Sequence, residues 1–241
     1  MDNNEIEKSN AMNASDTETA HPRWKGLYKI GGAAALFAVA IIPIQLAVFI
    51  VRGQPESALG GFTLFQSYEP AGLLAFEFLF VINGVLGIAT TLALYVVLRQ
   101  TNESLLAIAL VLGLIEAMAF IVARPALEML YLSNQYAAAT TDVLRATLLA
   151  AGEAMLATFK GTAFHVGNNF FSIYFLIAPI AMLQSNIFGR VTAYVGILAA
   201  ILNWGLYVPE IALLLSALSV LPLAIWNILI ARRLFQLGRA S

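Results

Sequence analysis

The sequence predicts an all-α membrane protein: a polytopic transmembrane helical bundle with six spans and one amphipathic helix on the membrane surface. Of the 241 residues, 60% are hydrophobic and only 11% are charged, and the mean hydropathy is +0.82. Because a soluble domain carries about 25% charged residues, such a chain could not cover its surface in water. Its length accommodates six spans of about 20 residues with short loops between them.

The expected spans are apolar stretches bounded by residues that start or stop helices. Pro70 starts the second span, and Glu103 lies where a carboxylate meets the positive end of the third helix, which alternatively continues past Pro125. Residues 191–230 would measure about 60 Å as one helix, twice the hydrocarbon thickness, so they must turn near Gly205 and Pro209. The six spans are residues 27–51, 71–98, 104–123, 162–184, 191–207 and 210–231.

Residues 141–159 follow a different pattern, in which apolar residues recur at helical spacing and charged residues lie off that stripe. This pattern predicts an amphipathic helix that lies on the membrane surface or across the helix ends. The alternative is a seventh span over residues 143–159. The apolar positions are Leu144, Leu148, Met155 and Phe159, and the charged ones are Asp142, Arg145 and Glu153.

Lysine and arginine residues predict the orientation in the cell inner (plasma) membrane. With six spans, nine of them fall on one side and four on the other, so the positive-inside rule places both termini in the cytoplasm. A seventh span would move Arg190 and the C-terminal arginines across and remove this bias. The cytoplasmic set is Lys8, Arg23, Lys25, Lys29, Arg99, Arg190, Arg232, Arg233 and Arg239, and the outer set is Arg52, Arg124, Arg145 and Lys160.

Composition also predicts the state of the N-terminal tail and excludes several kinds of partner and chemistry. Residues 1–22 are polar and predict a disordered cytoplasmic tail ahead of a single transmembrane domain at residues 23–241. Cysteine is absent, which excludes disulfides and thiolate chemistry, and the net charge of −1 gives no indication of nucleic acid. Zinc needs three or four converging ligands, whereas the histidines are only His21 and His165, so we expect no metal and no cofactor.

Glu116 is the clearest candidate for function, because ionisable groups inside a span are costly to bury. It lies about 18 Å along the third span, near the middle of the bilayer. We expect it to face inward and to contact a polar side chain of the second or fourth span, either Asn83 or Asn169. Arg124 is rotated from it by about 80° and should not be a direct partner.

Other polar residues gather in the outer halves of the spans, whereas the cytoplasmic halves are almost entirely Ala, Leu, Ile and Val. His165, Asn168 and Asn169 share one helix face at i, i+3 and i+4. A polar cavity open to the extracytoplasmic side would produce this distribution, and the lipid bilayer and a small-molecule ligand are the partners it implies. The ligand-binding candidates are Glu116, Glu77, Asn83, His165, Asn168, Asn169, Arg124, Asn203 and Tyr207.

Structural explanations compete for the same residues. Arg124 and Glu128 are four positions apart and could form an interfacial ion pair on one helix. Asn168 and Asn169 could serve only as hydrogen-bonding groups between helices. Lys160 could extend its ammonium to the interface.

Residues 174–238 carry a set of patterns that resembles a known family. They are Tyr174–Phe175–Leu176, the stretch from Ser185 to Arg190, the Gly196–Ile197 helix and the ending Ala231–Arg232–Arg233–Leu234–Phe235–Gln236–Leu237–Gly238. Together with the start Gly26–Leu27–Tyr28, they resemble the bacterial membrane proteins of the domain-of-unknown-function family DUF4386. The resemblance implies a six-helix membrane protein and supplies no catalytic residues.

Three functional hypotheses follow. The first is a bundle that binds or moves a small molecule through an outward-facing polar cavity. The second is a structural or regulatory partner of another membrane protein. The third is an intramembrane acid–base enzyme that uses Glu116 or Glu77 with His165, which no catalytic motif in the sequence supports.

The predicted orientation is tested by introducing single cysteines into this cysteine-free chain. An impermeant thiol reagent added from outside should label Ser57→Cys and a single cysteine in the region 133–142, such as Asp142→Cys. It should leave Gln100→Cys and Ser185→Cys unlabelled until the membrane is permeabilised. Labelling of Ser185→Cys in intact cells would contradict the six-span topology.

Overall fold

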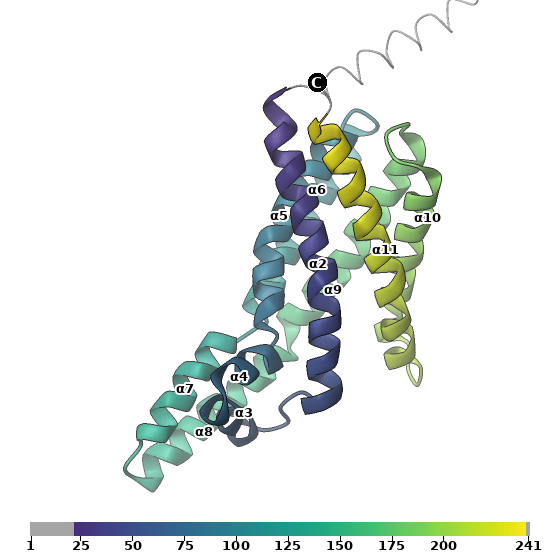
Figure 1. Ribbon diagram of the computed structural model, residues 1–241. Coiled ribbons are helices and arrows are strands. Elements are labelled where there is room, and N and C mark those ends of the chain that lie inside the picture. Colours follow the sequence, from purple (N-terminus) through teal and green to yellow (C-terminus); the bar gives the residue numbers. More distant parts are fainter. Residues whose placement is uncertain (1–21, 240–241) are drawn as a thin grey trace, which may run out of the picture. The chain divides into compact units, whose positions relative to one another are not determined.

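The computed structural model describes residues 22–239, and every regular element within this range is a helix (Figure 1). The predicted disordered tail therefore lies outside the described residues, apart from Pro22. The helices are α2 (Lys25–Arg52), α3 (Ala58–Ser67), α4 (Glu69–Ala75), α5 (Phe78–Leu98), α6 (Glu103–Val122), α7 (Ala126–Ala138), α8 (Asp142–Phe159), α9 (Thr162–Gln184), α10 (Arg190–Trp204) and α11 (Ala212–Arg239), with 3-10 turns η1 (Pro22–Trp24) and η2 (Gly205–Tyr207).

Within the described range, five helical stretches are long and apolar enough to cross a membrane, which confirms the all-α membrane class. The predicted span 191–207 is not among the five, because α10 has 15 residues and measures only about 22 Å. The six-span count is therefore not established by helix length and composition. The five stretches are Lys25–Val51, Phe78–Leu98, Glu103–Ala138, Asp142–Gln184 and Leu214–Arg239.

Two predicted elements differ from those observed. The expected span 71–98 is interrupted at Phe76 and Glu77, where α4 ends and α5 begins. The expected loop after the first span contains α3, although Gly60 and Gly61 favour a turn in isolation. Gly61 lies in a helix because its missing side chain admits a neighbour: a Cβ there would lie 2.9 Å from Phe76 Cζ.

Other boundaries agree closely with the sequence. The structure places α9 at Thr162–Gln184 as predicted, and residues 142–159 are helical. The helix α6 ends at Val122, and a separate helix, α7, begins after Pro125, within the same apolar stretch Glu103–Ala138. α11 extends to Arg239, beyond the predicted end at residue 231.

The described chain forms two compact units, of which the first comprises residues 22–39, 86–114 and 171–239. Its core combines aliphatic and aromatic residues, among them Phe175 and Trp226, whose rings are centred 4.4 Å apart; Trp226 is only 1% exposed. Helices α10 and α11 lie side by side in this unit (Figure 1). Because residues 208–211 connect them directly, they run antiparallel.

Close approach of backbones holds α2 against α5 in the first unit. A Cβ on Gly31 would lie 2.9 Å from Ala93 Cβ, so only glycine permits this spacing. Thr90 Oγ1 donates a 2.8 Å hydrogen bond to the Gly31 carbonyl. Small residues and hydroxyl groups of this kind are the usual means of helix association in membranes, where burial of apolar surface gives no driving force.

The second unit comprises Ala40–Val85 and Ile115–Phe170, and helices α3, α4, α7 and α8 pack together in it (Figure 1). Phe62, Phe76 and Met129 are completely buried at its centre. The N-terminus of α3 is held by α8, because the Ala58 amide donates a 2.8 Å hydrogen bond to Glu153 Oε1. This unit positions the candidate site.

The packing of α10 on α11 predicts opposite effects for two helix glycines. A Cβ on Gly196 would lie 2.5 Å from Pro179 Cγ and 2.7 Å from Trp226 Cδ1, so Gly196→Ala should lower the free energy of unfolding by about 1–3 kcal/mol through overpacking. Gly87 has no atom within 4 Å of such a Cβ, so Gly87→Ala should be neutral or stabilise by up to about 1 kcal/mol. Unfolding of both variants in detergent, followed by circular dichroism, measures the difference, and equal stabilities would contradict the packing.

Candidate functional site

A buried ion pair joins Glu77 to Arg124 in the second unit. Glu77 Oε2 accepts hydrogen bonds from Arg124 Nη2 at 2.8 Å and from Arg124 Nε at 3.0 Å. The two side chains are 14% and 5% exposed, respectively. Attraction between charges increases as water is excluded, so this pair differs in kind from an ion pair at the surface.

Both partners lie at helix breaks. Glu77 has φ 58° and connects α4 to α5, and Arg124 precedes Pro125 in the connection from α6 to α7. The left-handed conformation costs a residue other than glycine about 1–2 kcal/mol. The charged hydrogen bonds at the Glu77 carboxylate contribute free energy of similar size, which offsets this cost.

Hydrogen bonding satisfies Glu77 more fully than Arg124. The second carboxylate oxygen, Oε1, accepts a 3.0 Å hydrogen bond from Gln54 Nε2. Arg124 uses Nε and Nη2 on Glu77, but its Nη1 is buried and has no hydrogen-bond partner. A guanidinium has five N–H donors, so three of them remain after the contact with Glu77.

Four phenylalanine rings surround the guanidinium of Arg124. The ring of Phe120 is nearest, with its centroid 4.4 Å from Arg124 Cζ. Cations are attracted to the faces of aromatic rings, and the attraction grows when water is excluded. The other ring centroids lie 5.5 Å away for Phe164, 5.8 Å for Phe159 and 5.9 Å for Phe80.

A cavity of about 200 Å³ adjoins the ion pair. Lys160 and His165 are exposed, so the cavity opens to the surroundings on their side. Phe159 and Phe164 give it an apolar wall. The described residues that line it are Gln54, Glu77, Arg124, Phe159, Lys160, Phe164 and His165.

Glu116 does not have the partners expected from the sequence. It is half-buried on α6, and in the described part of the chain no hydrogen bond joins it to Asn83 or Asn169. Asn169 Nδ2 instead donates a 2.9 Å hydrogen bond to the carbonyl of His165 on its own helix. The cation that attracts Glu116 is Arg124, which acts without forming a direct hydrogen bond.

The remaining candidates are distributed over both units. Asn83 is half-buried on α5 and Asn168 is 6% exposed on α9, both in the second unit. Asn203 and Tyr207 belong to the first unit, where Asn203 Nδ2 donates a 2.8 Å hydrogen bond to Ser172 Oγ. Of the predicted site residues, Glu77, Arg124 and His165 line the same cavity.

The alternative in which Arg124 pairs with Glu128 differs from the structure, where Arg124 pairs with Glu77. The i, i+4 geometry requires one continuous helix, and Pro125 separates α6 from α7 between these residues. Sequence reasoning also missed Gln54 and the aromatic rings around Arg124. A loop glutamine and dispersed phenylalanines give no local signal, because only the tertiary fold brings them together.

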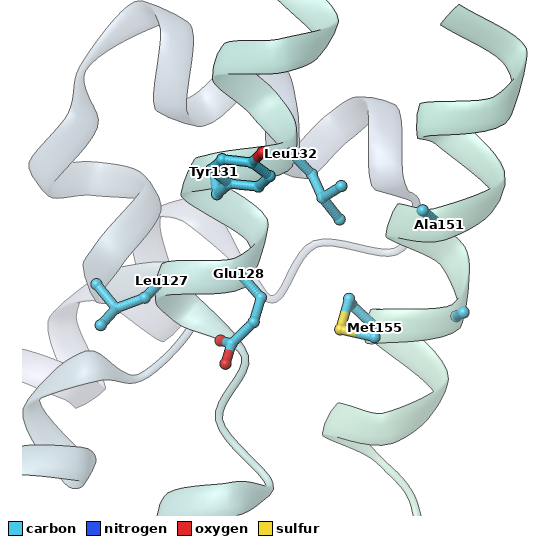
Figure 2. Close-up of a pocket in the computed structure, with 7 residues that line it drawn as sticks. Leu127, Glu128, Tyr131, Leu132, Ala151 and Met155 are labelled. Atoms are coloured by element: carbon cyan, nitrogen blue, oxygen red, sulfur yellow. The ribbon is translucent and has the colours of Figure 1, made fainter. Parts of the chain in front are cut away.

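A second, larger groove of about 620 Å³ lies between α7 and α8. Figure 2 shows Leu132 and Met155 pointing into the space between these two helices. Among the described residues of its lining, Glu128 is the one carboxylate, and the others are apolar apart from the hydroxyl group of Tyr131. Binding sites combine apolar walls with several converging polar groups, so the smaller cavity at Arg124 is the stronger candidate.

The helices and the buried charges together define a multi-pass helical membrane protein. Residues 26–236 match the sequence model of the domain of unknown function DUF4386, which covers most of the chain, so the chain belongs to this family. No curated protein and no solved structure is similar enough to count as a match.

Because the ion pair of Glu77 and Arg124 is buried, removing one charge should lower the free energy of unfolding more than removing both. Arg124→Met leaves the Glu77 charge buried without its partner and should lower the free energy of unfolding by about 3–5 kcal/mol. The double variant Glu77→Gln/Arg124→Met removes both charges and should restore much of that loss. Denaturant unfolding of the purified protein measures both values.

The matched control is the exposed ion pair of Arg145 with Asp142, whose charged atoms are 3.9 Å apart. Arg145→Met should leave the unfolding transition unchanged, because exposed pairs contribute little. Additive losses in the double variant at Glu77 and Arg124 would show that the two charges are not coupled.

Proposed function

We propose that this protein binds a small molecule in the cavity beside the Glu77–Arg124 pair. The observation that supports it best is the buried Nη1 of Arg124, which has no hydrogen-bond partner and belongs to a side chain that lines the cavity. Buried polar groups in folded proteins almost always have partners, so an exception next to a cavity favours a ligand.

The size of the cavity restricts the ligand. Sites for drug-sized molecules measure about 300–1,000 Å³, and 200 Å³ corresponds to the space of about six or seven water molecules. The cavity suits a small molecule or the polar end of a larger one that extends past Lys160 and His165. Both of these residues are exposed at its open side.

The membrane topology proposed with this function has six spans, both termini in the cytoplasm and the cavity open to the outer face of a bacterial inner membrane. The antiparallel packing of α10 on α11 supports the sixth span. Because α11 is long enough to cross the bilayer, a helix that packs along it lies at membrane depth too. η2 lengthens α10 at its outer end.

Binding is favoured over acid–base catalysis by the contacts of Glu77. Its two carboxylate oxygens already accept hydrogen bonds from Arg124 and Gln54, so they are engaged within the protein rather than directed at a substrate. A purely structural role for the pair would not require the adjoining cavity.

The test compares a variant that fills the cavity with one at the neighbouring position. His165→Trp places a large ring at a residue that lines the cavity, whereas Val166→Trp adds the same ring at an exposed residue outside it. Fragments of suitable size should raise the thermal unfolding midpoint of wild type and Val166→Trp, and should lose this effect in His165→Trp. Circular dichroism of the purified protein provides the measurement. A fragment set that stabilises all three proteins equally, or none of them, would overturn the proposed function.

A further inference from the structure

We infer that the group bound beside Arg124 is an anionic oxygen group, a carboxylate or a phosphate, joined to an apolar body. This inference rests on the proposed function and specifies the chemical class of its ligand. The donors, the charge and the walls of the cavity each support it.

One side chain in the lining, that of Arg124, is a cation with an unused hydrogen-bond donor. Arg124 is only 7% exposed, and its contact with Glu77 leaves Nη1 without a partner. A guanidinium presents its N–H groups in a planar fork that matches the oxygens of carboxylates and phosphates. A neutral carbonyl could accept one of these bonds, but it would not balance the positive charge of Lys160.

The charges in the lining favour an anion as well. Glu77 balances Arg124, and Lys160 adds a second positive charge at the open side. Glu116, the other carboxylate that attracts Arg124, does not line the cavity. Glu77, Arg124 and Lys160 together therefore carry one net positive charge, which one anionic group would neutralise.

Phe159 and Phe164 provide the apolar wall of the same cavity. Their rings already approach the guanidinium of Arg124, with centroids 5.8 Å and 5.5 Å from Cζ. An anion that also has an apolar body would contact the rings and the fork together. Small aromatic or aliphatic acids meet both requirements.

Three probes of nearly equal shape separate charge from size. Benzoate is the anion, benzamide is its neutral counterpart and benzylamine is the cation. Purified protein should show a concentration-dependent rise in its thermal unfolding midpoint with benzoate, and little or none with benzamide or benzylamine. The filled variant His165→Trp should lose the benzoate effect.

Lys160 allows the charge to be changed without disturbing the buried pair. Lys160→Gln should weaken benzoate binding about twofold to fivefold, as expected for one exposed cation, and Lys160→Arg should preserve it. Arg145→Gln removes a charge from the other end of α8, outside the lining, and should leave binding unchanged. The double variant Glu77→Gln/Arg124→Gln, which avoids a lone buried charge, should lose benzoate binding.

The anionic group could belong to a lipid or to a soluble molecule, and two further arms distinguish these sources. Inorganic phosphate is titrated as the soluble probe, and benzoate is titrated in nanodiscs of phosphatidylcholine with or without phosphatidic acid. Loss of the benzoate response only when phosphatidic acid is present supports a lipid headgroup at the site. An unchanged response to benzoate and phosphate supports a soluble anion.

The outcomes separate this inference from the proposed function. If benzamide or benzylamine stabilises wild type as strongly as benzoate and His165→Trp abolishes the effect, the cavity binds small molecules but the anionic assignment is overturned. The anionic assignment is also overturned if benzoate, phosphate and phosphatidic acid stabilise Lys160→Gln as much as they stabilise wild type. It is overturned as well if these anions stabilise neither of the two proteins. If His165→Trp keeps the benzoate effect, benzoate binds outside the cavity, and the anionic assignment is overturned as well.

Discussion

The buried ion pair between Glu77 and Arg124 is the constraint on which the second unit depends. Neither charge would be stable without the other in this buried environment, because desolvating an ion costs more free energy than a single hydrogen bond contributes. Each side chain must therefore stay within hydrogen-bonding distance of the other. The chain meets this requirement by ending α4 and α6 where it does and by starting α5 and α7 beyond the two charged residues.

The same requirement produces the features that point to ligand binding. Bending the backbone at Glu77 and Arg124 interrupts two helices at one place, and a cavity adjoins the interruption. Because Glu77 engages one edge of the guanidinium, the opposite nitrogen is left without a protein partner. The four surrounding phenylalanine rings stabilise the cation without using its N–H groups in conventional hydrogen bonds.

Packing elsewhere depends on the close approach of small residues. Gly31 lets α2 approach α5 in the first unit, and Gly152 lets α8 approach α3 in the second, where an added Cβ would lie 2.7 Å from Ala58 Cβ. Dispersion attraction between closely packed atoms contributes at both contacts, and for α2, a candidate membrane span, it replaces the hydrophobic driving force that a bilayer does not supply. The helices are thus fixed by shape, and the polar groups are free to define a site.

The sequence by itself determined the class of the protein and most of its helices. Long apolar stretches allow no other structure in a bilayer, because every backbone group must be hydrogen-bonded within its own segment. This reasoning placed α9 at its observed bounds and α2 within two residues of them, and it selected Glu77, Arg124 and His165 as candidates.

Only the tertiary structure decided which of these residues act together. Glu116 had the strongest signal from the sequence, yet Glu77 is the direct partner of Arg124. No proline or glycine occupies the helix break at Glu77, so the sequence carries no local signal for it. The left-handed backbone of Glu77 is instead stabilised by hydrogen bonds that its side chain accepts from Arg124 and Gln54. Those hydrogen bonds join residues 47 and 23 positions apart in the chain, and no local pattern encodes interactions over such separations.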